Sequence, residues 1–193
     1  MALLAGAGLL GAAIDTGFLE RPWPKERIRT FEVGRYAARW RQRLSKTEGL
    51  FAGVRVATPF PRQRVWELAN EYQDLGHMTP GVTAVRYVEQ TPTHDVIQID
   101  VKILWKSFTL AFEVDKEPPA IVRFQLDNPT LGQYRGLCRF DEAGPGTEVE
   151  LATWLKPARP VPLGLLLVVE RATMLHGLKE FLRVCERSAS LTP

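Results

Sequence analysis

One long apolar stripe near the C-terminus limits the folds open to this chain more than any other feature. Residues 162–187 repeat apolar side chains at spacings of three, four and seven, which predicts a single amphipathic helix. Such a helix is about 40 Å long at roughly 1.5 Å per residue, enough to cross the concave face of a curved sheet. A curved sheet whose concave face is covered by a helix can enclose a cavity, so the pattern favours a protein that binds an apolar molecule. The stripe consists of Leu167, Met174, Leu178, Phe181 and Cys185.

The segment before that helix alternates apolar and polar residues with a period of two. The alternation predicts seven antiparallel strands between residues 54 and 155. The expected class is α+β: a seven-stranded curved antiparallel sheet wrapped around the long C-terminal helix, with two short helices after strand 1, one of them over about residues 61–74. The positions expected to face the long helix are Ile97, Ile99, Val101 and Ile103; Phe108, Leu110, Phe112 and Val114; Val122, Phe124 and Leu126; and Val149, Leu151 and Leu155.

The first 50 residues differ in character from the rest, so we expect an N-terminal extension at 1–50 and a ligand-binding domain at 51–190. The extension has an apolar tail, a proline-containing linker at 21–30 and a basic segment, Phe31–Ser45, that we expect to be a helix. Residues 21–46 contain nine Lys or Arg against two acids, whereas the remainder has a net negative charge. Electrostatic attraction to an anionic membrane surface is therefore expected only from this segment. No stretch is long and apolar enough for a membrane span.

Residues suited to covalent or metal chemistry are sparse. Cys138 and Cys185 do not make a disulfide framework, and no histidines or cysteines have the spacing of metal ligands. The glycines of residues 6–11 mimic a dinucleotide fingerprint but follow no strand. We therefore expect no metal, no cofactor and no catalytic residues, although a one-residue shift in strand register would turn Asp100 or Glu113 inward.

Several short segments resemble one known superfamily in order and content. They are Val65–Tyr72, Met78–Val82, Ile99–Lys102 with Lys106–Thr109, Asp127–Pro129 and Gly136–Phe140. Together they resemble the START/Bet v 1-like (SRPBCC) helix-grip superfamily, in its polyketide cyclase/dehydrase and lipid-transport branch, and are similar to ubiquinone-binding START-like proteins. The resemblance covers about residues 53–188. It implies a helix-grip fold with a ligand cavity between the sheet and the last helix.

The expected function is to bind a hydrophobic small molecule, a lipid or isoprenoid quinone, as a carrier or chaperone in the cytoplasm, with peripheral membrane contact left open. An apolar cavity with a few hydroxyl groups is typical of such sites. Two alternatives stay open: a polyketide cyclase/dehydratase-type enzyme, and a ribosome- or RNA-associated interaction module, although a nucleic-acid partner is not favoured. The oligomeric state is left open. The expected ligand-binding residues are Met78, Ile97, Ile99, Val101, Phe108, Leu110, Phe112, Phe124, Tyr134, Thr153, Leu167, Met174 and Leu178.

Overall fold

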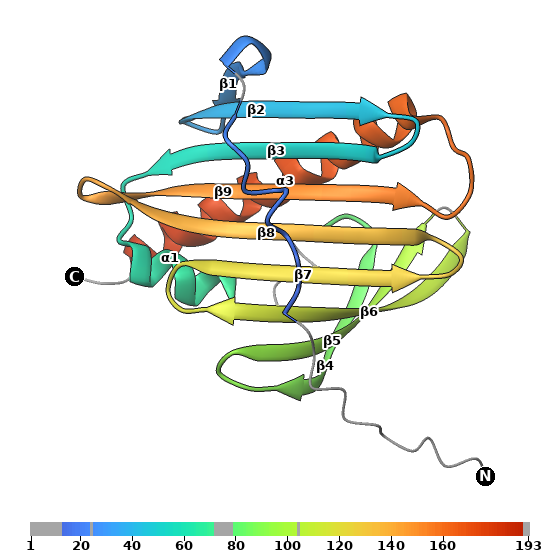
Figure 1. Cartoon of the computed structure of the whole chain (residues 1–193). Coiled ribbons are helices and arrows are strands. Elements are labelled where there is room, and N and C mark those ends of the chain that lie inside the picture. The colour runs from blue at the N-terminus through green and yellow to red at the C-terminus, as the bar shows by residue number, and fades with distance from the viewer. Residues whose placement is uncertain (1–12, 24, 72–78, 104, 191–193) are drawn as a thin grey trace.

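A single curved antiparallel sheet dominates the computed structural model, which describes residues 13–190 except 24, 72–78 and 104. The sheet has nine strands in the order β1-β2-β3-β9-β8-β7-β6-β5-β4, and a long C-terminal helix lies behind it (Figure 1). The elements are η1 (Lys25–Arg27), β1 (Arg29–Val33), β2 (Tyr36–Ser45), β3 (Gly49–Thr58), α1 (Arg62–Ala69), β4 (Val82–Gln90), β5 (His94–Ile103), β6 (Lys106–Glu117), β7 (Ile121–Asn128), β8 (Gly132–Ala143), β9 (Gly146–Pro157) and α3 (Leu163–Ser190).

The α+β class, the curved antiparallel sheet and the long C-terminal helix are confirmed, whereas the prediction of seven strands is wrong. The two additional strands, β1 and β2, occupy the segment Phe31–Ser45 that was expected to form a basic helix. A second short helix before Pro80 was also expected, and residues 72–78 lie outside the described part of the chain.

A β-hairpin replaces the expected basic helix for two physical reasons. Gly34 adopts a left-handed conformation, with φ of 62°, which closes the tight turn that pairs Val33 with Tyr36. Along β2, Tyr36, Ala38 and Trp40 are buried and alternate with exposed residues, which is the period of a strand. The same aromatic residues fit a helical spacing only loosely, and pairing with β3 decides the outcome.

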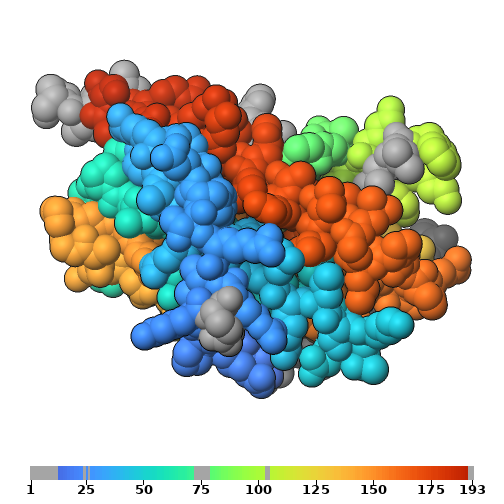
Figure 2. Space-filling model, turned by 90° about the horizontal axis from the view of Figure 1, so that it is seen from above, coloured from blue at the N-terminus to red at the C-terminus, as the bar shows by residue number. Residues whose placement is uncertain are grey.

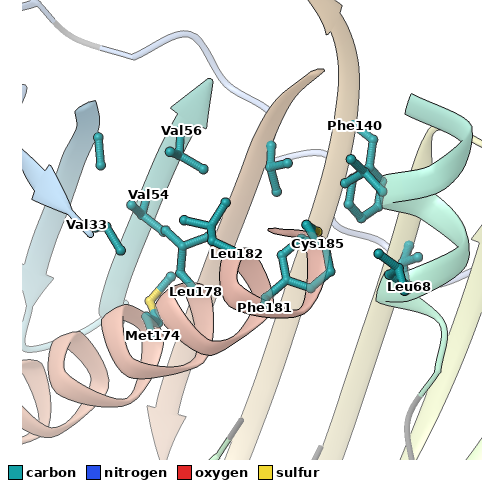
Figure 3. Packing of buried hydrophobic residues seen from close by; sticks show 14 of the residues in the cluster. Val33, Val54, Val56, Leu68, Phe140, Met174, Leu178, Phe181, Leu182 and Cys185 are labelled. Carbon is teal, nitrogen blue, oxygen red and sulfur yellow. The ribbon is translucent and has the colours of Figure 1, made fainter. Parts of the chain in front are cut away.

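The main core lies between the concave face of the sheet and α3. Met174, Leu178, Phe181, Leu182 and Cys185 line one side of α3 and are all buried. Figure 3 shows these side chains pointing towards the strands, where they meet Val33, Val54 and Val56. Leu68 from α1 and Phe140 from β8 extend the same cluster. In Figure 2, β1 and β2 (blue) lie beside α3 (red and orange), which agrees with the contact between α3 and β1.

The convex face of the sheet carries the N-terminal segment, which we call the strap (residues 14–23). In Figure 1 this segment crosses the front of the sheet, on the side opposite α3. Leu19 is fully buried against Leu137 and Ala152, and Phe18 packs edge-on against Trp154. The sheet is thus covered on parts of both faces by segments from the two ends of the chain.

A buried ionic group fixes the strap to the sheet. Glu150 of β9, which is 1% exposed, accepts hydrogen bonds from Trp23 Nε1 at 3.0 Å and from Arg55 Nη2 at 2.8 Å. Arg41 of β2 lies 3.4 Å from the same carboxylate and also donates to the backbone carbonyl groups of Leu19 and Arg21. The guanidinium groups of Arg41 and Arg55 lie 4.6 and 4.5 Å from the Trp23 ring. Strands and strap are therefore coupled through one carboxylate.

Candidate functional site

The concave face of the sheet is covered unevenly. Helix α3 packs against β1, β3 and α1, and the inward side chains of β2 and β3 beneath it are buried. The inward side chains of β5, β6 and β7 are less covered, and many of them keep part of their surface exposed. We call this region, together with Tyr134 of the neighbouring strand β8, the open apolar face; its other residues are Val101, Phe108, Leu110, Phe112 and Phe124.

Three aromatic rings form the centre of the open apolar face. The ring of Phe112 lies edge-on to those of Phe124 and Tyr134, at centroid distances of 6.4 and 6.2 Å. Phe124 and Tyr134 are stacked at 6.0 Å. Gly136 faces Phe124 across β7 and β8, and a β-carbon there would lie 2.0 Å from the ring. The absence of a side chain at Gly136 is therefore what allows Phe124 to lie flat over β8.

One carboxyl group lies beside these rings. Glu170 of α3 accepts hydrogen bonds through Oε1 from the Tyr134 hydroxyl at 3.0 Å and from the Thr153 hydroxyl at 2.7 Å. Burial raises the pKa of the Glu170 carboxyl, although its two hydrogen bonds act in the opposite direction. Burial also raises the pKa of Tyr134 well above its usual value, so its phenol is neutral and donates. The site therefore holds a titratable acid among apolar and hydroxyl groups.

Sequence reasoning missed Glu170 because it looked for inward polar and ionisable side chains only on the strands. The signal was present, however: Glu170 comes three residues after Leu167 and four before Met174, which places it on the apolar stripe of the helix. A charged residue on such a stripe faces the interior. Its partners, Tyr134 and Thr153, are 36 and 17 residues away in sequence, and only the fold brings them together.

The predicted ligand-binding residues divide into three groups in the structure. Those of β5, Ile97 and Ile99, are almost fully buried, and so are Met174 and Leu178 of α3, which pack in the main core. Met78 lies outside the described residues. The others are on the concave face or on α3 beside it: Val101, Phe108, Leu110, Phe112, Phe124, Tyr134, Thr153 and Leu167.

Other candidate reactive groups lie away from the open apolar face or are inert. Asp100 and Glu113 point outwards and hydrogen-bond with Arg86 and Gln125, respectively, so the register shift that would turn them inward does not occur. Burial raises the pKa of the Cys138 thiol to about 12, which leaves it protonated and unreactive at neutral pH. Among the described residues there is no group of three or more His, Cys, Asp or Glu side chains able to hold a metal ion.

Comparison with known protein families places this geometry in context. The family described as "Polyketide cyclase / dehydrase and lipid transport" matches residues 58–182, so the chain belongs to that family. The resemblance to START/Bet v 1-like proteins is thereby confirmed. A comparison with curated protein sequences gives no significant match.

Solved structures of low sequence identity share the fold. Human STARD10 is 9% identical, with a TM-score of 0.68 over 96% of this chain and 84% of its own. A STAR-related lipid transfer protein from Xanthomonas axonopodis is 14% identical, with a TM-score of 0.66 over 83% of this chain and 99% of its own. The Zhui aromatase/cyclase from Streptomyces sp. R1128 is 16% identical, with a TM-score of 0.64 over 72% of this chain and 94% of its own. The same fold is thus used by proteins named for lipid transfer and for cyclisation.

Proposed function

We propose that this domain binds a hydrophobic small molecule, a lipid or isoprenoid quinone, on the open apolar face beside α3. The observation that carries the proposal is the partial exposure of inward aromatic side chains, Phe112 and Phe124, on a sheet face that otherwise forms the core. Covering about 200 Å² of such apolar surface would contribute about 5 kcal/mol. The lipid-transfer protein of the same fold supports a role as carrier or chaperone.

Native mass spectrometry of the purified chain, followed by solvent extraction, tests this proposal. We expect a stoichiometric apolar molecule that is lost from Leu110→Gln, which places an amide on the open apolar face. Val88→Gln is the matched control, because Val88 is 60% exposed on β4. Equal retention of the molecule by both variants would count against a site on the open apolar face.

An enzyme of the cyclase or dehydratase type is the second candidate, and Glu170 is the observation that favours it. A carboxyl group with a raised pKa beside an aromatic surface can act as a general acid or base. The Zhui aromatase/cyclase shows that the fold accommodates such chemistry. Turnover of an added aromatic polyketide that depends on Glu170 would favour the enzyme, whereas stoichiometric retention of an unchanged molecule would favour the carrier.

We further propose that the ligand is exchanged at an anionic membrane surface. Trp105, Leu165, Val168 and Val169 are between 54% and 79% exposed. They lie in the turn between β5 and β6 and near the start of α3, which are at the same end of the sheet (Figure 1). Exposed apolar side chains gathered in this way are typical of surfaces that contact lipid. Within the described residues no helix is long and apolar enough to cross a membrane.

Charge around these apolar residues supports an anionic partner. Lys102, Lys106, Lys156 and Arg159 are exposed at the same end, and none forms an ion pair within the described part of the chain. Basic residues near anionic lipid contribute about 1 kcal/mol each. In the segment 21–46, which was expected to make this contact, four of the nine cations form ion pairs with other described residues.

Vesicle flotation distinguishes the two membrane-contact regions. We expect binding to phosphatidylcholine vesicles only when phosphatidylglycerol is added, and a loss of binding in a Trp105→Ser, Val168→Ser double variant. Val88→Ser is the control for the loss of one exposed apolar side chain. If an Arg27→Gln, Arg29→Gln variant loses binding to the vesicles while the Trp105→Ser, Val168→Ser variant keeps it, contact occurs through residues 21–46 instead.

A further inference from the structure

We propose that Glu170 holds the polar end of the ligand and selects a molecule that carries a neutral oxygen function, a carbonyl or a hydroxyl, and not an anionic one. The inference rests on the proposed function, since it names the chemical class of the molecule on the open apolar face. It comes from the arrangement of Glu170, Tyr134 and Thr153.

The two oxygens of Glu170 are used unequally. Oε1 accepts both hydrogen bonds, from the Tyr134 and Thr153 hydroxyls. Within the described part of the chain, Oε2 makes no hydrogen bond. It is not fully buried and keeps some accessible surface. The carboxyl group is therefore held in one orientation by two neutral donors, while its second oxygen is left to meet a ligand.

The surroundings of Glu170 contain polar groups but no countercharge. The hydrogen-bond partners of Glu170 are the hydroxyl groups of Tyr134 and Thr153, and the Thr153 hydroxyl also lies 3.7 Å from the Met174 sulfur. Within the described residues Glu170 forms no ion pair, and the nearest basic side chain along the helix, Arg171, lies over the rings of Phe31 and Trp40. A carboxylate or phosphate on a ligand would meet no positive partner here.

This arrangement defines what the ligand can present. A protonated Glu170 donates from Oε2 to a carbonyl oxygen, and an ionised one accepts from a hydroxyl group. An anionic end group is disfavoured in both states, because the charge would be desolvated without a partner or placed next to another negative charge. The aromatic rings of Phe112 and Phe124 then contact the apolar body of the same molecule.

Four naphthalenes of similar size test this inference. They are 2-isopropylnaphthalene, 2-acetylnaphthalene, 1-(2-naphthyl)ethanol and 2-naphthoate, and each competes with the neutral fluorescent dye N-phenyl-1-naphthylamine. We expect the wild-type chain to bind the ketone or the alcohol about fivefold more tightly than the hydrocarbon, the effect of one net hydrogen bond. We expect 2-naphthoate to be the weakest of the four.

Two variants assign the preference to Glu170. In Glu170→Leu the affinity for the hydrocarbon should be kept while the preference for the oxygen-bearing probe disappears, which also shows that the variant is folded. Glu180→Leu, on the same helix in an ion pair with Arg183, should keep the wild-type ratios. An unchanged ratio in Glu170→Leu, or naphthoate binding as tightly as the ketone, overturns the inference. If the wild-type chain binds neither dye nor any naphthalene, the proposed function itself fails.

Discussion

Removal of the Glu150 charge should destabilise the protein far more than removal of a neighbouring charge on the same strand. Glu150 is 1% exposed and binds Arg41, Arg55 and Trp23, whereas the side chain of Glu148 is 25% exposed and pairs with Arg39 and Arg55. Both carboxylates point to the convex face of β9. The pair of substitutions Glu150→Gln and Glu148→Gln therefore makes the same chemical change at two levels of burial.

The magnitude follows from what Glu150→Gln leaves behind. Burial lowers the pKa of Arg41 to about 10, so its guanidinium stays charged at neutral pH and would lose its carboxylate partner. Breaking a buried ion pair by removing one partner costs about 3–5 kcal/mol. Loss of the partly exposed ion pairs of Glu148 with Arg39 and Arg55 should cost about 0–1 kcal/mol. The retained hydrogen bonds of Arg41 to Leu19 and Arg21 place the expected cost for Glu150 towards the lower end, about 3 kcal/mol.

Urea unfolding at pH 7, monitored by tryptophan fluorescence, measures both costs. At about 2 kcal/mol per molar urea, Glu150→Gln should lower the midpoint by roughly 1.5 M. Because Glu150 also binds Trp23, the strap should become more accessible, and chymotrypsin should cleave after Phe18 or Leu19 faster than in the wild type. If the free energies of unfolding of the two variants agree within about 1 kcal/mol, the reasoning about burial is wrong.

Three further predictions concern the concave side. Glu170→Gln should raise the free energy of unfolding by about 1 kcal/mol near pH 7. Because the pKa of Glu170 is raised in the folded chain, its ionisation costs stability as the pH rises through that pKa. Urea titrations should therefore show the gain of the variant shrinking as the pH falls towards the ordinary value of 4.5, and a pH-independent difference would contradict it. Gly136→Ala should displace the Phe124 ring and cost about 1–3 kcal/mol, measured by urea unfolding, while Gly164→Ala, with open space around it, should not. Cys138 and Cys185, with pKa values raised by burial to about 12, should react with a disulfide reagent at pH 8 only after denaturation; rapid labelling of the native chain would refute this.

The two candidate functions make different use of the same carboxyl group. A carrier needs Glu170 only as a hydrogen-bonding partner, so Glu170→Gln should retain much of the affinity for a ketone through its amide N–H. A cyclase needs a proton to move, so the same variant should abolish turnover while binding is kept. The comparison of Gln and Leu at position 170 therefore separates binding from catalysis.

Local patterns in the sequence determined the concave core and most of the sheet. The apolar stripe of residues 162–187 became α3, and the alternation in residues 97–114 became β5 and β6, with Ile97, Ile99, Phe112 and Val114 facing the core as predicted. These elements could be predicted because burial of one face imposes a period of two or of 3.6 on a contiguous stretch of chain. The number of strands could not be predicted, since the alternation in Tyr36–Trp40 is short and only Ala37 and Arg39 separate its buried residues.

Tertiary structure alone decided the features that join distant residues. The Trp23–Glu150 bond connects residues 127 positions apart, so the strap could not be inferred from local spacing. Glu170 was visible on the helical stripe, but the hydrogen bonds that orient its carboxyl group come from hydroxyls supplied by β8 and β9. The open apolar face exists because α3 packs against β1 and β3 and leaves β5–β7 less covered, a matter of where a helix rests on a sheet. Periodicity indicates which face of an element is buried. Packing decides which other element covers that face and which part of its surface stays accessible.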